Sequence, residues 1–594
     1  MMWNFEQEIS EYIWKTKYQY HDGGKILEPT IDHTWHRVAN AVASCESSKE
    51  QPYWQKKFHE LLEDFKFLPG GRILAGAGTA HKVTLFNCFV MQIKQDSVSG
   101  IFNALREGAL TLQQGGGIGY DFSILRPSGY RCKKTHAIAS GPVSFMKIWD
   151  SMSATMVSST ARRGAMMANL RCDHPDIMEF IKIKSHPSEL RHFNLSVIIT
   201  NEFMDAVVAD SDWPLVFPGK NGRTVLRRWS GSPYPINCEI IKVIKARDLW
   251  LRIMESAYAY AEPGVIFEDT INNLNPLWYK EWISATNPCG EIPLPYYGAC
   301  NLGSINLTQF VRHPFTALAK LDWRHLEAVI KVATRFLDNV VEISHYPLKA
   351  QKYAALNTRR LGLGFTGLAN VFLMLGIPYG SAESLALAKS ISQKVAFTTW
   401  ETSCQLGRDK GSFPLFSQDY LAGQFVLSLP PELQQEIRKY GMRNSHHNAI
   451  APTGSISLLA NNVSGGIEPI FASQYERSIR GANKDKIQFR IEDYAFHLWR
   501  KEHQGLPPAW KEVKTLAPQD HLAIQGAVQP YIDNAISKTI NLPEDYPFNQ
   551  LPDIYLQAHE LGLKGCTIFR PNPITGSVLW TEETDPCCSL PGVR

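Results

Sequence analysis

The sequence predicts an α/β fold with a mainly parallel β-sheet, and two observations support this fold class. Between residues 84 and 575, short apolar runs alternate with longer amphipathic stretches, an order typical of buried strands connected by helices. No low-complexity linker, fixed-period repeat or change of composition divides this part of the chain. The apolar runs are TLFNCFVM, FNLSVIIT, GVIFED, RLGLGFTG and GCTIF.

The first part of the chain, residues 1–83, is predicted to be helical. In EQEISEYIWKTKY and QPYWQKKFHELLEDFKF, apolar residues recur three and four positions apart. The segment FLPGGRILAGAGT breaks this pattern at Pro69, Gly70 and Gly71. We therefore expect a helical region at 1–83, an α/β region at 84–575 and a polar, turn-rich tail at 576–594.

Composition excludes several classes of protein. The chain has 594 residues, of which 44% are hydrophobic and 20% charged, as in ordinary globular proteins. A formal net charge of +4 creates no strong field for nucleic acid, and no run of about 18 apolar residues could span a membrane. Eleven cysteines are too sparse for a disulfide scaffold and indicate a reducing compartment. We expect a cytoplasmic protein with neither nucleic acid nor a membrane as its partner.

The segment NPCGEIPLPYYGAC places an amide, a thiol and a carboxylate close together at Asn287, Cys289 and Glu291. Its prolines exclude a helix and favour an extended backbone. Alternate side chains of an extended chain face the same side, so we expect these three to project together. The alternative is a buried structural cysteine beside a surface glutamate, and the segment alone leaves both open.

Other segments add groups that could take part in chemistry. Cys88 lies in the apolar run LFNCFV, and Cys300 begins the second run, CNLGSINL. The glycine-rich turn that starts at Gly115 would let backbone approach a ligand closely. The turn APTGSIS, residues 451–457, leads into an apolar run and would offer N–H groups and hydroxyls to a phosphate. The same turn could simply cap a helix, and it lacks the lysine of a Walker loop.

Taken together, these segments resemble the large catalytic subunit of ribonucleotide reductases, and in particular the adenosylcobalamin-dependent (class II) group. The resemblance extends from about Phe67 to Pro573. It implies a ten-stranded α/β barrel made of two halves, each with a parallel five-stranded sheet, around a central finger loop. The motifs that carry it are FLPGGRILAGAGT, FNCFV, GGGIGYDFSILRP, SGPVSFMKIWD, ARRGAMMANLRCDHPDI, FNLSV, NPCGEIPLPYYGACNLGSINL, APTGSIS with SGGIEPIFA, and GLKGCTIFRPNP.

The resemblance implies a role for each residue of the central segment. Cys289 would become a thiyl radical that removes the 3′ hydrogen of a ribonucleotide. Glu291, with an ordinary pKa of about 4.3, would act as general base, and Asn287 would bind the sugar. Cys88 and Cys300 would supply the electrons and end as a disulfide. The residues implied for substrate binding are Asn87, Gly115, Gly116, Gly117, Pro452, Thr453, Gly454, Ser455, Ile456 and Ser457.

The implied cofactor is adenosylcobalamin, and no metal-binding residues are predicted. Class I enzymes carry a tyrosine pair where this chain has Thr567, Ile568 and Phe569, and no glycyl-radical segment is present. The eleven-residue step between Cys289 and Cys300 also fits the cobalamin group. The alternative is a class I large subunit that needs a separate radical-generating subunit. The likeness to dimeric members favours ribonucleoside diphosphates as substrates and a homodimer.

Regulation and re-reduction are further expectations from the resemblance. Asp96 and Arg163 are candidate contacts for a deoxynucleotide or ATP effector, although Arg163 could be part of a solvated basic pair. No ATP-cone pattern is found in the N-terminal region. Cys587 and Cys588 would pass electrons from a thioredoxin-like reductant. They are adjacent, so a disulfide between them would be strained, and they could instead be incidental thiols.

Two other functions explain these residues less well than a reductase does. A nucleotide-binding regulatory protein that kept the barrel would not need the three central cysteines and Glu291. A cysteine hydrolase using His446 or His447 as its base would leave Cys88 and Cys300 unexplained. The remaining cysteines, including Cys172 near His174, are expected to be plain thiols.

Overall fold

The structure is a computed structural model that describes residues 5–131, 138–156, 165–186, 189–232, 234–480 and 486–571. The chain forms two compact units, which are taken in turn below. Unit 1 contains residues 5–87 and 299–538, and unit 2 contains residues 88–298 and 539–571 of the described chain. Within the described ranges, no helix is both long and apolar enough to cross a membrane.

Unit 1 begins with the predicted helical region. Its helices α1 (Glu8–Ile13), α2 (Ile31–Ala43) and α3 (Gln51–Leu62) confirm the three- and four-residue apolar spacing. The predicted break falls where strand β3 (Phe67–Pro69) gives way to the short helix α4 (Gly71–Gly76). The buried face of α2 packs on α3, and both helices contact α11 (Trp323–Ile343).

The strands of unit 1 are mainly parallel. β14 (Ala299–Asn306) pairs in parallel with β17 (Leu361–Thr366) and antiparallel with β3. Parallel bridges continue from β17 at Leu363 to Asn448 and from Ile450 to Ile536. Helix α11 packs on β14 and β17, because its apolar residues form one buried stripe and Asp322 caps its first turn.

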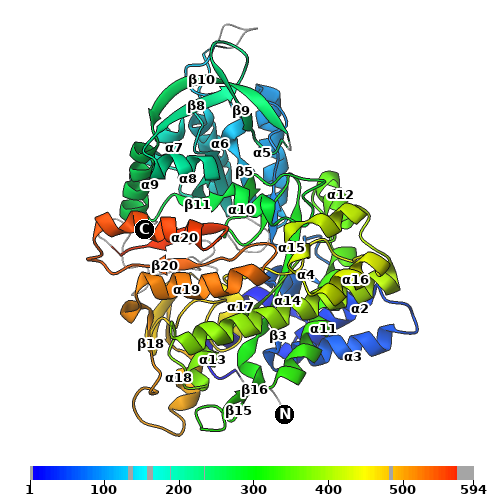
Figure 1. Ribbon diagram of the computed structural model, residues 1–594. Helices are drawn as coiled ribbons and strands as arrows, with labels where there is room; N and C mark the ends of the chain where they lie inside the picture. Colours follow the sequence, from blue (N-terminus) through cyan, green and yellow to red (C-terminus); the bar gives the residue numbers. More distant parts are fainter. Residues whose placement is uncertain are drawn as a thin grey trace. The chain divides into compact units, whose positions relative to one another are not determined.

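Unit 1 contains further described helices and strands, many of them labelled in Figure 1. The helices are α12 (Lys349–Thr358), α13 (Leu368–Met374), α14 (Ala382–Lys410), α15 (Gln424–Leu427), α16 (Pro431–Tyr440), α17 (Gly454–Leu459), α18 (Tyr494–Trp499) and α19 (Pro518–Val528). The strands are β1 (His21–Asp22), β2 (Lys25–Ile26), β15 (Val311–Arg312), β16 (Lys320–Leu321), β18 (Gln474–Arg480) and β19 (Lys486–Glu492).

Unit 2 is built on five neighbouring parallel strands, as expected for one half of the predicted fold. They run in the order β4 (Cys88–Val90), β5 (Gly117–Asp121), β6 (Met166–Arg171), β7 (Phe193–Ile199) and β11 (Gly264–Phe267). Most of their residues are buried, which explains why the sequence shows them as apolar runs. β21 (Gly565–Phe569) then pairs antiparallel with β11 and parallel with β20 (Thr539–Asn541).

Helices connect these strands, and a small second sheet was not predicted. The helices are α5 (Val98–Gln113), α6 (Pro142–Thr155), α7 (Ile177–Lys182), α8 (Asn201–Val208), α9 (Ala246–Tyr260), α10 (Glu268–Asn273) and α20 (Leu551–Glu560). The small sheet is antiparallel, with β10 (Pro235–Lys245) between β8 (Asp212–Pro218) and β9 (Thr224–Arg228) (Figure 1). The central segment forms a hairpin between β12 (Ala285–Thr286) and β13 (Pro293–Leu294).

Candidate active site

The hairpin β12–β13 presents the predicted catalytic segment at its tip. The turn closes tightly, because Gly290 N donates to Asn287 O at 3.1 Å and Ile292 N donates to Asn287 Oδ1 at 2.9 Å. Gly290 has φ 80°, a conformation that glycine adopts at little cost. The expected extended run from Asn287 to Glu291 is therefore wrong, since two antiparallel strands six residues apart leave room only for a turn. The prediction that no helix forms here is confirmed.

The turn nevertheless brings two of the three predicted side chains together, along with a third from another strand. Asn287 Nδ2 donates to Glu291 Oε2 at 2.7 Å and to Cys88 Sγ at 3.1 Å. The Cys88 thiol lies 3.9 Å from Glu291 Oε1. Cys88 reaches this position as the first residue of β4. We call Cys88, Asn287 and Glu291 the thiol–carboxylate cluster.

Burial sets the acidity of the carboxyl group in this cluster. Glu291 is 1% exposed and Asn287 is fully buried. Loss of water around the carboxylate raises the pKa of Glu291 to about 7, and the hydrogen bond from Asn287 opposes part of this rise. The expected ordinary pKa is therefore wrong. A carboxyl group with a pKa near 7 can both take and return a proton at neutral pH, which suits a general base.

Cys289 lies on the same turn but in a different environment. Its side chain is half-buried, whereas the three members of the cluster are buried. Pro288 O, in the peptide immediately before Cys289, accepts a hydrogen bond from Asn194 Nδ2 at 2.9 Å. This thiol is thus held on an anchored turn while part of it stays accessible.

Two residues that fix the hairpin were not identified from the sequence. Asn194, in β7, is the one amide side chain in the apolar run FNLSVIIT, and this was the available signal. Gly119, in β5, lies so close to the hairpin that a Cβ at this position would be 1.9 Å from Thr286 O. Any larger residue at position 119 would push the hairpin away from β5.

Cys300 belongs to unit 1, where it is buried in β14. Its Sγ contacts Asn301 O at 3.3 Å and would be 3.1 Å from a Cβ at Gly362. Cys88 and Cys300 are both in the reduced thiol form in the structure. Their pairing stays a prediction.

The predicted phosphate turn adopts a strained backbone conformation at the residue just before helix α17 (Gly454–Leu459). Thr453 has φ 57° and precedes α17, a helix of six residues. The Thr453 hydroxyl lies 2.9 Å from that of Thr366, and Ser455 Oγ accepts a hydrogen bond from Tyr18 at 2.9 Å. Pro452, Gly454, Ile456 and Ser457 complete the turn and first helical residues. The N-terminal region thus contacts this turn, a link that the sequence did not reveal.

Two buried oxygen atoms without a hydrogen-bond partner lie at or beside predicted substrate residues. Among the described residues, Asn87 Oδ1 in unit 1 and Gln114 Oε1 in unit 2 have no partner. Gln114 directly precedes the loop Gly115–Gly116–Gly117, in which Gly115 has φ 91°. A buried polar atom left unpaired is costly, so each marks a place where a ligand could supply the missing donor.

The regulatory residues are only partly described. Asp96 accepts from Arg126 Nε at 2.5 Å and from the Arg126 backbone N–H at 3.2 Å, so its carboxylate already has a partner. Arg163 and the tail residues Cys587 and Cys588 lie outside the described residues. Cys172 and His174 are buried, and His174 Nε2 lies 2.9 Å from Leu125 O.

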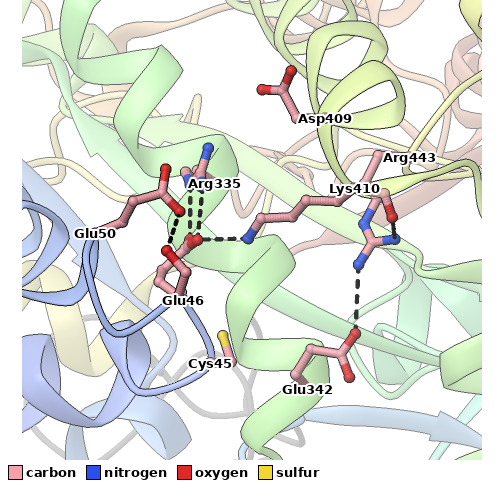
Figure 2. A pocket seen from close by; sticks show the side chains of 9 residues that line it. Cys45, Glu46, Glu50, Arg335, Glu342, Asp409, Lys410 and Arg443 are labelled. Atoms are coloured by element: carbon pink, nitrogen blue, oxygen red, sulfur yellow. Dashed lines mark hydrogen bonds and ion pairs between the residues drawn. The ribbon is translucent and has the colours of Figure 1, made fainter.

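A charged pocket of about 490 Å³ in unit 1 contains none of the predicted site residues (Figure 2). Figure 2 shows Arg335 and Lys410 pointing at Glu46. Arg335 Nη2 lies 2.7 Å from Glu46 Oε2, and Lys410 Nζ lies 2.9 Å from Glu46 Oε1. Burial opposes ionisation of Glu46, but these hydrogen bonds lower its pKa to about 2. The pocket is best explained as a set of ion pairs that joins α11, α14 and the end of α2.

Comparison with known proteins identifies the family. The family description "Ribonucleotide reductase, barrel domain" matches residues 86–569, and "Ribonucleotide reductase, all-alpha domain" matches residues 4–82. The chain belongs to the ribonucleotide reductase family. This confirms the resemblance seen in the sequence and the α/β class with a helical N-terminal region.

Curated relatives agree with this assignment. The chain is 37% identical over 598 residues to the vitamin B12-dependent ribonucleoside-diphosphate reductase of Mycobacterium tuberculosis (strain CDC 1551 / Oshkosh), covering 97% of this chain and 80% of the relative. The protein of the same name from Thermoplasma acidophilum is 35% identical over 554 residues, covering 90% and 67%. The ribonucleoside-diphosphate reductase subunit alpha of Chlamydia muridarum is 27% identical over 503 residues, covering 78% and 47%.

Proposed function

We propose that the chain reduces ribonucleoside diphosphates to 2′-deoxyribonucleoside diphosphates by a thiyl-radical mechanism that depends on adenosylcobalamin. The observation that carries the proposal is the thiol–carboxylate cluster directly beside Cys289 on an anchored turn. The names of the relatives support the substrate class and the dependence on vitamin B12.

The residues present fit the proposed cofactor in two respects. Cys289 is half-buried while its neighbours Asn287 and Glu291 are buried, so Cys289 is the most accessible of these three residues. β21 contains Thr567, Ile568 and Phe569 and no tyrosine that could relay a radical from a second subunit. When bound, adenosylcobalamin supplies the one-electron oxidation that converts a cysteine thiol into a thiyl radical.

The roles of the chain's own residues follow from this geometry. The Cys289 radical takes the 3′ hydrogen atom of the ribose, and Glu291 takes the proton of the 3′ hydroxyl. The 2′ hydroxyl leaves as water after gaining a proton from a thiol. Cys88 and Cys300 give up two electrons and two protons in total and form a disulfide. Cys289 finally returns a hydrogen atom to the 3′ carbon, and Glu291 returns its proton to the 3′ oxygen. The short contacts of Cys88 with Asn287 and Glu291 support a place for its thiol beside the reacting ribose.

Substrate binding is proposed at two places. Asn87 and the turn at residues 452–457 belong to unit 1, and the loop at residues 115–117 belongs to unit 2. The unpaired Oδ1 of Asn87 supports the first place, and the unpaired Oε1 of Gln114 supports the second.

Regulation, re-reduction and location are also proposals. Asp96 and Arg163 would contact a deoxynucleotide or ATP effector in a homodimer. The carboxylate of Asp96 already pairs with Arg126 when the effector binds. Cys587 and Cys588 would accept electrons from a thioredoxin-like reductant in the cytoplasm.

The Cys289→Ser variant tests the proposed role of the turn. Serine keeps the size and polarity but does not form a comparable radical, so we expect loss of deoxynucleotide formation with nucleotide binding nearly intact. Cys45→Ser, which changes a thiol in the charged pocket of Figure 2, is the matched control and should retain turnover. Unchanged turnover in Cys289→Ser would refute the proposal.

A further inference from the structure

Three potential metal ligands gather on two packed helices of unit 1, outside the residues assigned above. Asp32 and His36 are four positions apart on α2, so they lie on the same face of that helix. His59 is in the last turn of α3, which packs against α2. One ligand atom from each of the three side chains lies within 4.8 Å of the other two.

The two imidazole rings share one carboxylate. His59 Nε2 lies 2.8 Å from Asp32 Oδ1, and His36 Nε2 lies 3.4 Å from Asp32 Oδ2. The two rings are stacked, with centroids 4.0 Å apart and planes inclined by 23°. Both Nε2 atoms lie beside Asp32, and the two rings must rotate out of this stack for both lone pairs to reach one ion.

These separations suit a tetrahedral ion. Zinc bonds to nitrogen and oxygen are about 2.0–2.1 Å long, which places neighbouring tetrahedral ligand atoms roughly 3.3 Å apart. The distances of 2.8 Å to Asp32 Oδ1 and 3.4 Å to Asp32 Oδ2 are near that value, and rotation of the two imidazole side chains would bring both nitrogens to one ion. We propose that Asp32, His36 and His59 form a Zn²⁺ site that links α2 to α3.

The type of ligand selects the ion. Two imidazole nitrogens and one carboxylate oxygen suit Zn²⁺ and neighbouring transition metals, whereas Ca²⁺ and Mg²⁺ prefer oxygen ligands throughout. The side chains of His36 and Asp32 are 59% and 52% exposed, and that of His59 is 19% exposed. An ion can therefore enter from solvent, and water completes the fourth position.

The site would act on the N-terminal helical region and takes no part in radical chemistry. The helix α3 also packs on α11 through Phe58 and Phe336, whose ring centroids are 5.3 Å apart. A metal ion bound by both α2 and α3 would add a second restraint on the position of α3. Occupancy should raise the temperature at which the chain unfolds, because the ion binds only the folded arrangement.

Titration of the metal-free, full-length chain without an affinity tag tests the proposal. Calorimetry with Zn²⁺ should show one ion bound through these residues. His36→Asn and His59→Asn should each weaken that binding at least about 10- to 100-fold, the range found even for groups that only support metal ligands. His33→Asn is the matched control: His33 is an exposed histidine of the same helix that contacts Thr30, and its loss should leave binding unchanged.

Co²⁺ distinguishes this site from the cysteines of the tail. Bound Co²⁺ should give the visible absorption of a nitrogen- and oxygen-ligated ion, without a sulfur charge-transfer band, and Cys587→Ser/Cys588→Ser should retain it. Zn²⁺ should raise the unfolding temperature of the native chain and of His33→Asn but not of His59→Asn. Absence of saturable binding, or binding unaffected in both His36→Asn and His59→Asn, would overturn the proposal.

Discussion

Replacing Asn287 with alanine should move the acid limb of the pH–rate profile to higher pH. Asn287 Nδ2 donates to Glu291 Oε2 at 2.7 Å and stabilises the ionised carboxylate. Burial raises the pKa of Glu291 to about 7 in spite of this hydrogen bond. Without the Asn287 donor, less opposes the effect of burial on the carboxylate, so the pKa of Glu291 must rise further.

The size of the shift can be worked out from the hydrogen bond. A hydrogen bond to a charged group contributes about 1.5–3 kcal/mol, and about 1.4 kcal/mol corresponds to one pKa unit. Water entering the vacated space would replace part of this contribution, so we expect a rise of about one unit, from about 7 to about 8. At pH 7 the ionised fraction of Glu291 would then fall from about one half to about one tenth, and kcat/KM would fall about fivefold from this cause.

The assay is kcat/KM for ribonucleoside diphosphate between pH 5.5 and 9.5, with saturating adenosylcobalamin and a dithiol. Asn287 is also proposed to bind the sugar, so its loss should lower the plateau as well, and the diagnostic quantity is the position of the acid limb. Asn194→Ala is the control, because Asn194 supports the turn through Pro288 O and does not contact Glu291. It should lower kcat with the limb unmoved. An acid limb at the same pH in Asn287→Ala and the native chain would refute the reasoning.

Three further predictions concern the same site. Glu291→Gln should abolish turnover yet raise the unfolding temperature, by more at pH 8 than at pH 5. Below its ordinary pKa of about 4.5 the native carboxyl group does not lower the free energy of unfolding, and above its folded pKa of about 7 it lowers that free energy by about 3 kcal/mol. An equal rise of the unfolding temperature at both pH values would contradict this. Gly119→Ala should lower kcat about 100-fold without loss of folding, since a Cβ 1.9 Å from Thr286 O must displace the hairpin; native kcat would count against that role of the glycine. Cys88→Ser should stop steady-state deoxynucleotide formation, and continued turnover with dithiol would remove Cys88 from the mechanism.

Several strands of the fold could be predicted because buried strands consist mostly of apolar residues. FNLSVIIT and GVIFED became β7 and β11, whose residues are buried on both faces and so read as continuous apolar runs. The small sheet β8–β10–β9 was missed. Its strands are partly exposed and mix polar with apolar residues, which leaves a weaker signal.

The candidate site was predicted in its residue types but not in its local geometry. The prolines around Cys289 correctly excluded a helix, but the sequence could not show that β12 and β13 pair and so force a turn at Gly290. The ordinary pKa expected for Glu291 was wrong for a related reason. Glu291 is buried beside Cys88 of β4, which lies 203 positions away in the sequence.

The contribution of Asn194 was equally hidden. Its contact with Pro288 O joins residues 94 positions apart, and only the fold brings them together. The catalytic assignment, in contrast, could be predicted from the sequence, because it rests on an ordered set of motifs along the chain. Such a set identifies a family even where no single motif explains the chemistry.

Product formation by the purified chain alone is the most direct test of the proposed function. The chain would be incubated with adenosylcobalamin, a dithiol and a ribonucleoside diphosphate, with the triphosphate tested in parallel. We predict that the deoxyribonucleoside diphosphate accumulates over many turnovers with no second protein present. A chain that binds the nucleotide but yields deoxynucleotide only after a radical-generating subunit is added would contradict the account and favour a class I large subunit.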